Sequence, residues 1–239
     1  MSHILAMGGG GFRLDERWVS RPGPLVEHAL SLTGSETPRV AGLFTATGDA
    51  VSDIAGWYAA FAGRPERVSH VELVPMPNVD DVRAHLLAQD AVYVGGGSVA
   101  ALMVLWRLHG LDAVLREAHK AGVVLFGVSA GSLCWHVGGT TDSFGPELRP
   151  WTDGLALVSG SNCPHYDSEA RRRPLFQALV AEGALPPGYA ADDGVALHYV
   201  DGVLHEAVRD REDCAAWRVD VGGETRIDAR RLQAPTSSV

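Results

Sequence analysis

Short apolar runs alternate with stretches of helical periodicity along the first half of the chain. This alternation is typical of βαβ units built around a parallel sheet. The predicted strands are His3–Met7, Arg39–Phe44, Val68–Val74, Ala91–Val94 and Val123–Val128. The predicted helices are Leu25–Leu32, Ser52–Ala62 with Ser52 as N-cap, Val79–Gln89, Val99–Leu108 and Leu111–Ala121. Because Val123–Val128 is apolar throughout, we expect it to be covered on both faces.

The pattern changes after Trp135. Gly138–Pro150 has the composition of a loop, Leu155–Val158 is a short strand candidate, and Arg171–Ala181 has a helical period. Three further strands follow with Asp201-Gly202 and Gly222-Gly223 as turns, namely Val195–Val200, Val203–Val208 and Ala216–Val221. We predict one domain over residues 1–232 and a frayed tail over 233–239.

Charge and cysteine content narrow the class of protein. The formal net charge of −9 disfavours a nucleic-acid binder, because such proteins need clustered Lys and Arg. The three cysteines form no C-x-x-C pair, which favours a reducing compartment. Met1–Met7 lacks the basic and apolar regions of a signal peptide, and apolar runs such as Ala101–Trp106 are too short to span a membrane. We therefore expect a cytoplasmic protein without nucleic-acid or membrane partners.

A candidate nucleophile follows the clearest strand. The sequence Gly127-Val128-Ser129-Ala130-Gly131 lies where that strand meets a predicted helix, Ala130–His136. A G-x-S-x-G match in this context predicts a sharp turn that presents Ser129 at the carboxyl end of the sheet. The Ala130 amide, at the helix start, is then a candidate oxyanion donor. The alternative is that Ser129 only caps the helix.

Two glycine runs also end predicted strands. The run Gly95-Gly96-Gly97 lets backbone amides approach a substrate closely and predicts the second oxyanion donor at Gly96 or Gly97. The alternatives are a turn without a ligand and a phosphate cradle, although no Gly-Lys-Ser/Thr follows. The run Gly8–Gly11 departs from the dinucleotide motif at Arg13 and is either a pocket wall or a structural turn.

A serine nucleophile needs a base, usually an imidazole oriented by a carboxylate. Among ten histidines, His165 stands out because it lies in a loop just after a predicted short strand. Asp193, beside Asp192 in a turn before a strand, is a candidate for the orienting acid, and Asp142 and Asp167 compete with it. Aspartates at turns commonly serve only to shape the turn.

With these residues assembled, the chain resembles the peptidase E family of serine peptidases, which is related to cyanophycinases. The resemblance covers most of the chain and is most specific in Tyr93–Gly97, Gly127–Gly131 and Pro164–Asp167. It implies a three-layer, flavodoxin-like α/β fold akin to class I glutamine amidotransferases, with a central, mostly parallel sheet. It also implies hydrolysis of short peptides without a metal or cofactor. The best-known members cleave dipeptides with an N-terminal aspartate.

By position, the resemblance assigns Ser129 as nucleophile, His165 as base, and Gly96, Gly97 and Ala130 as the oxyanion hole. It favours Asp193 as the third member of the triad, with Asp192 and Asp142 as alternative acids. Arg171 falls near a family arginine that can pair with an acidic substrate side chain. The loop before it is shorter than in aspartyl dipeptidases and three arginines run together, so a solvated helix start is the competing interpretation.

Two other functions are compatible with these residues. An α/β-hydrolase esterase or amidase would take its base from a late histidine such as His198 or His205. A non-catalytic small-molecule-binding protein on the same scaffold would need no base. A class I amidotransferase is disfavoured because its elbow needs cysteine where Ser129 stands, and Cys134 is expected to pack. A short peptide is the expected substrate; the oligomeric state does not follow from the sequence, which allows a homo-oligomer.

Overall fold

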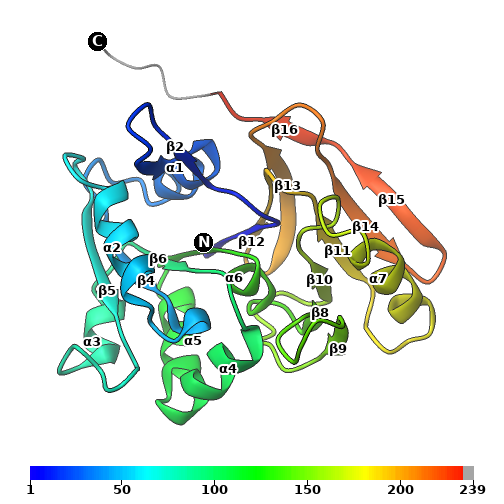
Figure 1. The fold of residues 1–239 in the computed structure, drawn as a ribbon, viewed down its shortest axis with the longest axis horizontal. Coiled ribbons are helices and arrows are strands. Elements are labelled where there is room, and N and C mark those ends of the chain that lie inside the picture. Colours follow the sequence, from blue (N-terminus) through cyan, green and yellow to red (C-terminus); the bar gives the residue numbers. More distant parts are fainter. Residues whose placement is uncertain (234–239) are drawn as a thin grey trace.

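The computed structural model describes residues 1–233 and contains an eight-stranded central sheet (Figure 1). From edge to edge the strands are β16 (Ala229–Arg231), β13 (Val203–Arg209), β12 (Val195–Val200), β1 (His3–Met7), β7 (Val124–Val128), β6 (Ala91–Val94), β4 (Arg39–Leu43) and β5 (Arg67–Val71). The run from β1 to β5 is parallel, whereas β12 is antiparallel to β1 and to β13. The predicted α/β class with a mostly parallel central sheet is confirmed. Most of the predicted tail lies outside the described residues.

Alternating side chains of the strands point to opposite faces of the central sheet. Each face forms a hydrophobic core with the helices that cover it. In β1, Ile4 and Ala6 face one core, and Leu5 and Met7 face the other. The first core is completed by helices α3 (Val82–Leu87), α4 (Val99–Leu108) and α5 (Leu111–Lys120). The second is completed by α1 (Pro24–Ser31) and α2 (Val51–Ala60). A short hairpin of β2 (Phe12–Leu14) and β3 (Ser20–Pro22) and the 3-10 turn η1 (Thr45–Thr47) join these elements.

A second, mixed sheet follows beside the first, on the side of the molecule away from α2 and α3 in Figure 1. Its strands, in order, are β15 (Gly223–Ile227), β14 (Ala216–Asp220), β11 (Gly188–Ala191), β10 (Ser161–Cys163), β8 (Gly138–Thr141) and β9 (Arg149–Trp151). Helix α7 (Arg172–Ala181) packs on it through Phe176 and Val180, which are fully buried.

The prediction of a loop over Gly138–Pro150 is wrong, because this segment contains β8 and the start of β9. Glycine at two successive positions gives a strand little sequence signal. The fold nevertheless needs both: a Cβ at Gly138 would overlap with the Trp151 carbonyl oxygen, and a Cβ at Gly139 with that of Asn162.

The strand prediction over Leu155–Val158 is also wrong, for a reason that involves the helix before it. Helix α6 (Ala130–Leu133) ends three residues earlier than predicted. The amides of Leu155 and Leu157 donate to the carbonyls of Cys134 and Trp135, each at 2.8 Å. The segment therefore satisfies the carbonyls at the end of a short helix, which no periodic pattern predicts.

Ser52 does not cap its helix. Helix α2 begins at Val51 with Ala50 as N-cap and no side-chain cap bond. Val51 is an exposed apolar residue, 81% exposed, and neither it nor Ala50 is a residue type that marks the start of a helix. Within residues 1–233, no helix combines the length and apolar character that crossing a membrane requires.

Candidate active site

Ser129 lies on the turn between β7 and α6 with φ 57° and ψ −111°. A non-glycine residue with positive φ is strained and persists only where its surroundings hold it. The flanking glycines explain how this turn fits. A Cβ at Gly127 would lie 2.5 Å from the Gly131 carbonyl oxygen, and a Cβ at Gly131 would overlap with the Val94 carbonyl oxygen. Both glycines of the motif are thus required by close backbone packing against β6.

The Gly95–Gly97 run lies beside this turn. A Cβ at Gly96 would be 3.3 Å from Ser129 Cβ, so the backbone of the run packs closely against the serine. Gly95 N–H donates to the Leu43 carbonyl and Ser98 N–H to the Ala46 carbonyl. Among residues 1–233, the amides of Gly96 and Gly97 donate no hydrogen bond. Two free N–H groups next to a strained serine are suited to bind an oxyanion.

His165 and Asp193 form a hydrogen-bonded pair, with His165 Nδ1 2.7 Å from Asp193 Oδ1. This bond to the imidazole is the main cause that holds the pKa of Asp193 below its ordinary value. With the carboxylate ionised, Nδ1 is the protonated nitrogen and Nε2 is free to accept a proton. His165 also has positive φ, 55°.

The end of β1 connects the serine with this pair. Ser129 N–H donates to the Met7 carbonyl and His165 N–H donates to the Gly8 carbonyl, each at 3.2 Å. The two candidate residues are therefore fixed to adjacent positions of one strand end. No hydrogen bond joins Ser129 Oγ to the His165 ring in the part of the chain that the structure describes; such contacts commonly tighten only when substrate binds.

The other candidate acids lie elsewhere. Asp192 is buried and accepts hydrogen bonds from Ala215 N and Trp217 Nε1. The Asp142 carboxylate is largely exposed and lies 3.9 Å from the Arg172 guanidinium. Asp167 accepts a bond from the Asp193 amide at 2.8 Å and so supports that residue's backbone. Of the acids considered, Asp193 is the one that the structure brings to His165.

A cavity of about 320 Å³ opens at Ser129 and is lined by charged side chains, namely Asp142, Glu169 and Arg172, together with Gly97, Ser98 and Ser143.

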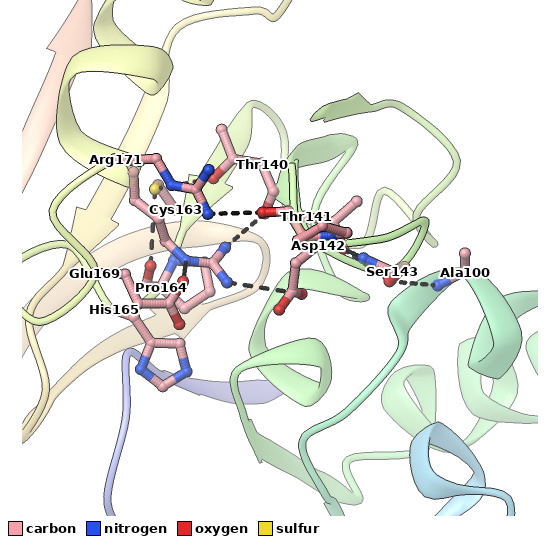
Figure 2. Close-up of polar contacts among 12 residues, drawn as sticks. Ala100, Thr140, Thr141, Asp142, Ser143, Cys163, Pro164, His165, Glu169 and Arg171 are labelled. Atoms are coloured by element: carbon pink, nitrogen blue, oxygen red, sulfur yellow. Dashed lines mark hydrogen bonds and ion pairs between the residues drawn. The ribbon is translucent and has the colours of Figure 1, made fainter. Parts of the chain in front are cut away.

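Arg172, which is 3% exposed, donates to Glu169 at 2.7 Å and to the Thr140 carbonyl at 2.8 Å. Arg171 instead donates to the Pro146 carbonyl. Figure 2 shows Thr140 and Asp142 on one side of this region and Glu169, Arg171 and His165 on the other. The arginine at the serine is thus Arg172, one residue beyond the predicted Arg171.

A second cavity, of about 330 Å³, is lined in part by Gly95 and Gly96. Its walls are largely aromatic and comprise Phe12, Phe44, Trp57 and Tyr93, with Thr47, Asp53 and other residues around them. The glycine run therefore contributes to both cavities, with Gly95 and Gly96 lining the aromatic one and Gly97 lining the charged one.

Comparison with known proteins decides the family, since the model of peptidase family S51 matches residues 4–207. The chain belongs to peptidase family S51, the peptidase E family. It is accordingly a serine-type peptidase, and the predicted resemblance is confirmed.

Two curated proteins illustrate the relationship. The chain is 42% identical over 219 residues, 92% of each protein, to an uncharacterized peptidase, YgaJ, of Bacillus subtilis strain 168. It is 27% identical over 136 residues to a peptidase E of Shewanella denitrificans, a match that covers 53% of this chain and 57% of that protein.

Solved structures agree on the fold. A peptidase from an acI-B1 actinobacterium superposes with a TM-score of 0.65 at 17% identity, covering 98% of this chain and 97% of the other. A putative peptidase E of Listeria monocytogenes EGD-e gives 0.58 at 17% identity, covering 92% of this chain and all of the other. The predicted class I glutamine amidotransferase-like architecture of this S51 chain is confirmed.

The geometry adds residues that the sequence did not indicate. Arg211 Nε donates to the Asp193 carbonyl at 2.7 Å, and its guanidinium also pairs with Asp167. Nothing in its charged surroundings in the sequence distinguishes Arg211 from a surface residue. The base candidates of the esterase alternative lie elsewhere: His198 contacts His3 and His205 is exposed on β13.

Proposed function

We propose that this S51 peptidase hydrolyses short peptides through an acyl-enzyme on Ser129, with His165 as base and Asp193 as its orienting acid. The observation that carries the proposal is the 2.7 Å bond between His165 and Asp193, held at the same strand end as the strained serine. Nucleophile, base and orienting acid are the groups that peptide hydrolysis without a metal requires.

In the proposed reaction, Ser129 Oγ attacks the scissile carbonyl carbon while its proton passes to His165 Nε2. The resulting oxyanion accepts hydrogen bonds from the Ala130 amide and from Gly96 or Gly97, whose N–H groups are otherwise unused. The C–N bond then breaks as His165 protonates the leaving amine. Water, deprotonated by His165, hydrolyses the ester and regenerates the serine.

The charges beside Ser129 bear on the substrate class. Asp142 and Glu169 outnumber Arg172 in the cavity, and Arg172 is already paired with Glu169. An acidic substrate side chain would meet net negative charge there, whereas the ammonium group of a free amino terminus would be attracted. We therefore propose that short peptides with a neutral first residue are cleaved in preference to Asp-X dipeptides.

The aromatic cavity suits the substrate's apolar side chain. Phe12, Phe44 and Trp57 offer an apolar surface, and the cavity reaches Gly96, which lies against Ser129. Apolar area transferred from water to such a surface contributes about 25 cal/mol per Å². We propose that an apolar residue next to the scissile bond occupies it.

A fluorophosphonate probe tests the nucleophile, because it reacts readily with an activated serine. Wild-type protein and Ser129→Ala are compared with Ser143→Ala, which removes another hydroxyl from the same cavity. We expect labelling and peptide cleavage in the wild type and in the Ser143 variant, and neither in the Ser129 variant. Labelling of Ser129→Ala at the wild-type rate would refute the assignment.

A panel of dipeptides and tripeptides tests the substrate class. We expect Leu-X and Phe-X peptides to have higher kcat/KM than Asp-X and Glu-X peptides. Glu169→Gln is expected to narrow that difference by removing one carboxylate. Faster cleavage of Asp-X than of Leu-X would contradict the proposed preference while leaving the assignment of Ser129 intact.

A further inference from the structure

Two buried histidine nitrogens face the same carboxylate on the α1 side of the central sheet, away from Ser129. His28 Nε2 lies 3.9 Å and His198 Nδ1 lies 3.7 Å from Glu206 Oε1. These residues come from α1, β12 and β13, and their three candidate ligand atoms all lie within 4.8 Å of one another. No sequence motif announces the group, because its members are far apart in the chain.

Both histidine nitrogens lack a hydrogen-bond partner within residues 1–233, although both are buried. His198 is only 3% exposed. Buried polar atoms are almost always satisfied, so two unsatisfied nitrogens that converge on one carboxylate need an explanation. At 3.7 and 3.9 Å, the Glu206 oxygen is too distant to accept a hydrogen bond from either ring.

We propose that His28 Nε2, His198 Nδ1 and the Glu206 carboxylate bind a divalent transition-metal ion of the Zn²⁺ class. Two imidazoles and one carboxylate form a donor set that suits such ions and leaves coordination positions for water. Tetrahedral ligands about 2.1 Å from zinc are roughly 3.4 Å apart, so a movement of less than about 1 Å per side chain would close the site.

A second shell for this site already exists. His198 Nε2 lies 3.0 Å from His3 Nδ1, so the nitrogen that does not face Glu206 has a hydrogen-bond partner. Metal-binding histidines are almost always oriented in this way through their other ring nitrogen. Burial lowers the pKa of His198 to about 4 and lowers that of His28, which keeps both rings unprotonated at neutral pH.

Arg230 is the cation that a metal would have to displace or share. Its guanidinium donates to both oxygens of Glu206, at 2.7 and 2.8 Å. The Arg230 side chain is 53% exposed and lies on β16, at the edge of the sheet. The bidentate geometry makes Arg230 a real competitor for the carboxylate, and its half-exposed side chain lets it turn out to solvent when a metal ion binds.

The site is separate from the peptidase centre. His3 is four residues before Met7 on β1, and it is Met7 that binds the Ser129 amide. At about 3.3 Å per residue, roughly 13 Å of strand lies between the two. The metal would therefore tie α1 to β12 and β13 without taking part in hydrolysis.

The test is direct metal titration of the full chain after dialysis against EDTA. Zn²⁺ is followed by isothermal titration calorimetry, and Co²⁺ by the visible absorption that appears when nitrogen ligands bind it. We expect one ion per chain and a rise in the thermal unfolding midpoint with Zn²⁺ concentration. Absence of binding at one ion per chain by the wild type would overturn the proposal.

Variants locate the ion. Glu206→Gln is expected to weaken binding by at least about 100-fold, and His3→Ala by about tenfold as the loss of a second-shell partner. Arg230→Gln is expected to tighten binding by about two- to fivefold, because a competing cation is removed. His70→Gln, which disrupts another His–Glu pair at 3.1 Å, is the matched control and should bind as the wild type does.

Unchanged binding in Glu206→Gln, or loss of binding in His70→Gln, would place the ion elsewhere and refute the site. If Glu206→Gln fails to fold, the Arg230→Gln variant decides on its own: weaker or unchanged Zn²⁺ binding would contradict the proposal.

Discussion

The α-carbon of Gly9 packs directly against the carboxylate of Asp193, with no room for a side chain between them. A Cβ at Gly9 would overlap with Asp193 Oδ1 and lie 2.9 Å from His165 Nδ1. The backbones are also bridged, since Gly194 N–H donates to the Gly9 carbonyl at 3.0 Å. The glycine run after the first strand is therefore part of the wall that holds the His165–Asp193 pair.

Gly9→Ala is expected to lower kcat/KM by at least about 100-fold, because a misplacement of about 1 Å in a catalytic group can cost that much. Gly10→Ala is the matched control. Its Cβ would have 3.9 Å to the nearest atom, but φ is +83°, so we expect a loss of stability of about 1–2 kcal/mol with near-normal activity. Equal activity losses in the two variants would show that Gly9 has no special role.

Asp193→Asn is expected to reduce kcat by about 10³- to 10⁴-fold, since the amide can no longer stabilise the imidazolium or fix its tautomer. Asp142→Asn, at an exposed carboxylate away from His165, should change kcat less than about tenfold. Steady-state kinetics on one dipeptide measures both. A larger kcat defect in the Asp142 variant would reassign the acid.

Arg172→Ala is expected to destabilise the fold by about 2–4 kcal/mol. The substitution removes the hydrogen bonds that the buried guanidinium donates to Glu169 and to the Thr140 carbonyl, and it leaves that carbonyl without this partner. Arg171→Ala removes an exposed side chain and should change stability by less than about 0.5 kcal/mol. Urea unfolding compares them. Equal free energies of unfolding in the two variants would show that the buried contacts of Arg172 do not stabilise the fold.

His136 should make stability depend on pH. It is fully buried, with Nδ1 3.0 Å from the Ser132 carbonyl and Nε2 3.0 Å from Tyr199 Oη. Burial lowers its pKa to about 4 from an ordinary 6.5. Below pH 6.5 the unfolded chain takes up a proton on this imidazole, whereas the folded chain takes it up only near pH 4. The stabilisation contributed by the neutral ring is therefore fully present above pH 6.5 and is lost as the pH falls toward 4.

The shift corresponds to about 3 kcal/mol between those limits. His136→Asn cannot titrate, so its unfolding free energy should fall less steeply than that of the wild type from pH 6.5 to pH 4. Urea unfolding at several pH values measures the two slopes; parallel slopes would show that His136 is not the group responsible.

Periodicity and local motifs determined much of this protein. The strands of the parallel run were predicted to within a few residues, because buried strands and amphipathic helices carry their burial pattern in the sequence itself. The serine turn was also readable, since Gly127 and Gly131 are needed by the local backbone on which Ser129 lies. The short strands of the second sheet were harder to predict, because glycine in β8 and pairing with distant strands leave little local signal.

Only the tertiary structure decided which distant groups meet. It selected Asp193 over its neighbour Asp192, turned Arg172 rather than Arg171 toward Ser129, and brought His28 and His198 to one carboxylate. Adjacent residues of like type have nearly the same local sequence, so nothing in that sequence separates them. Which one faces a site depends on strand register and on close backbone packing, and both arise only when the sheets assemble.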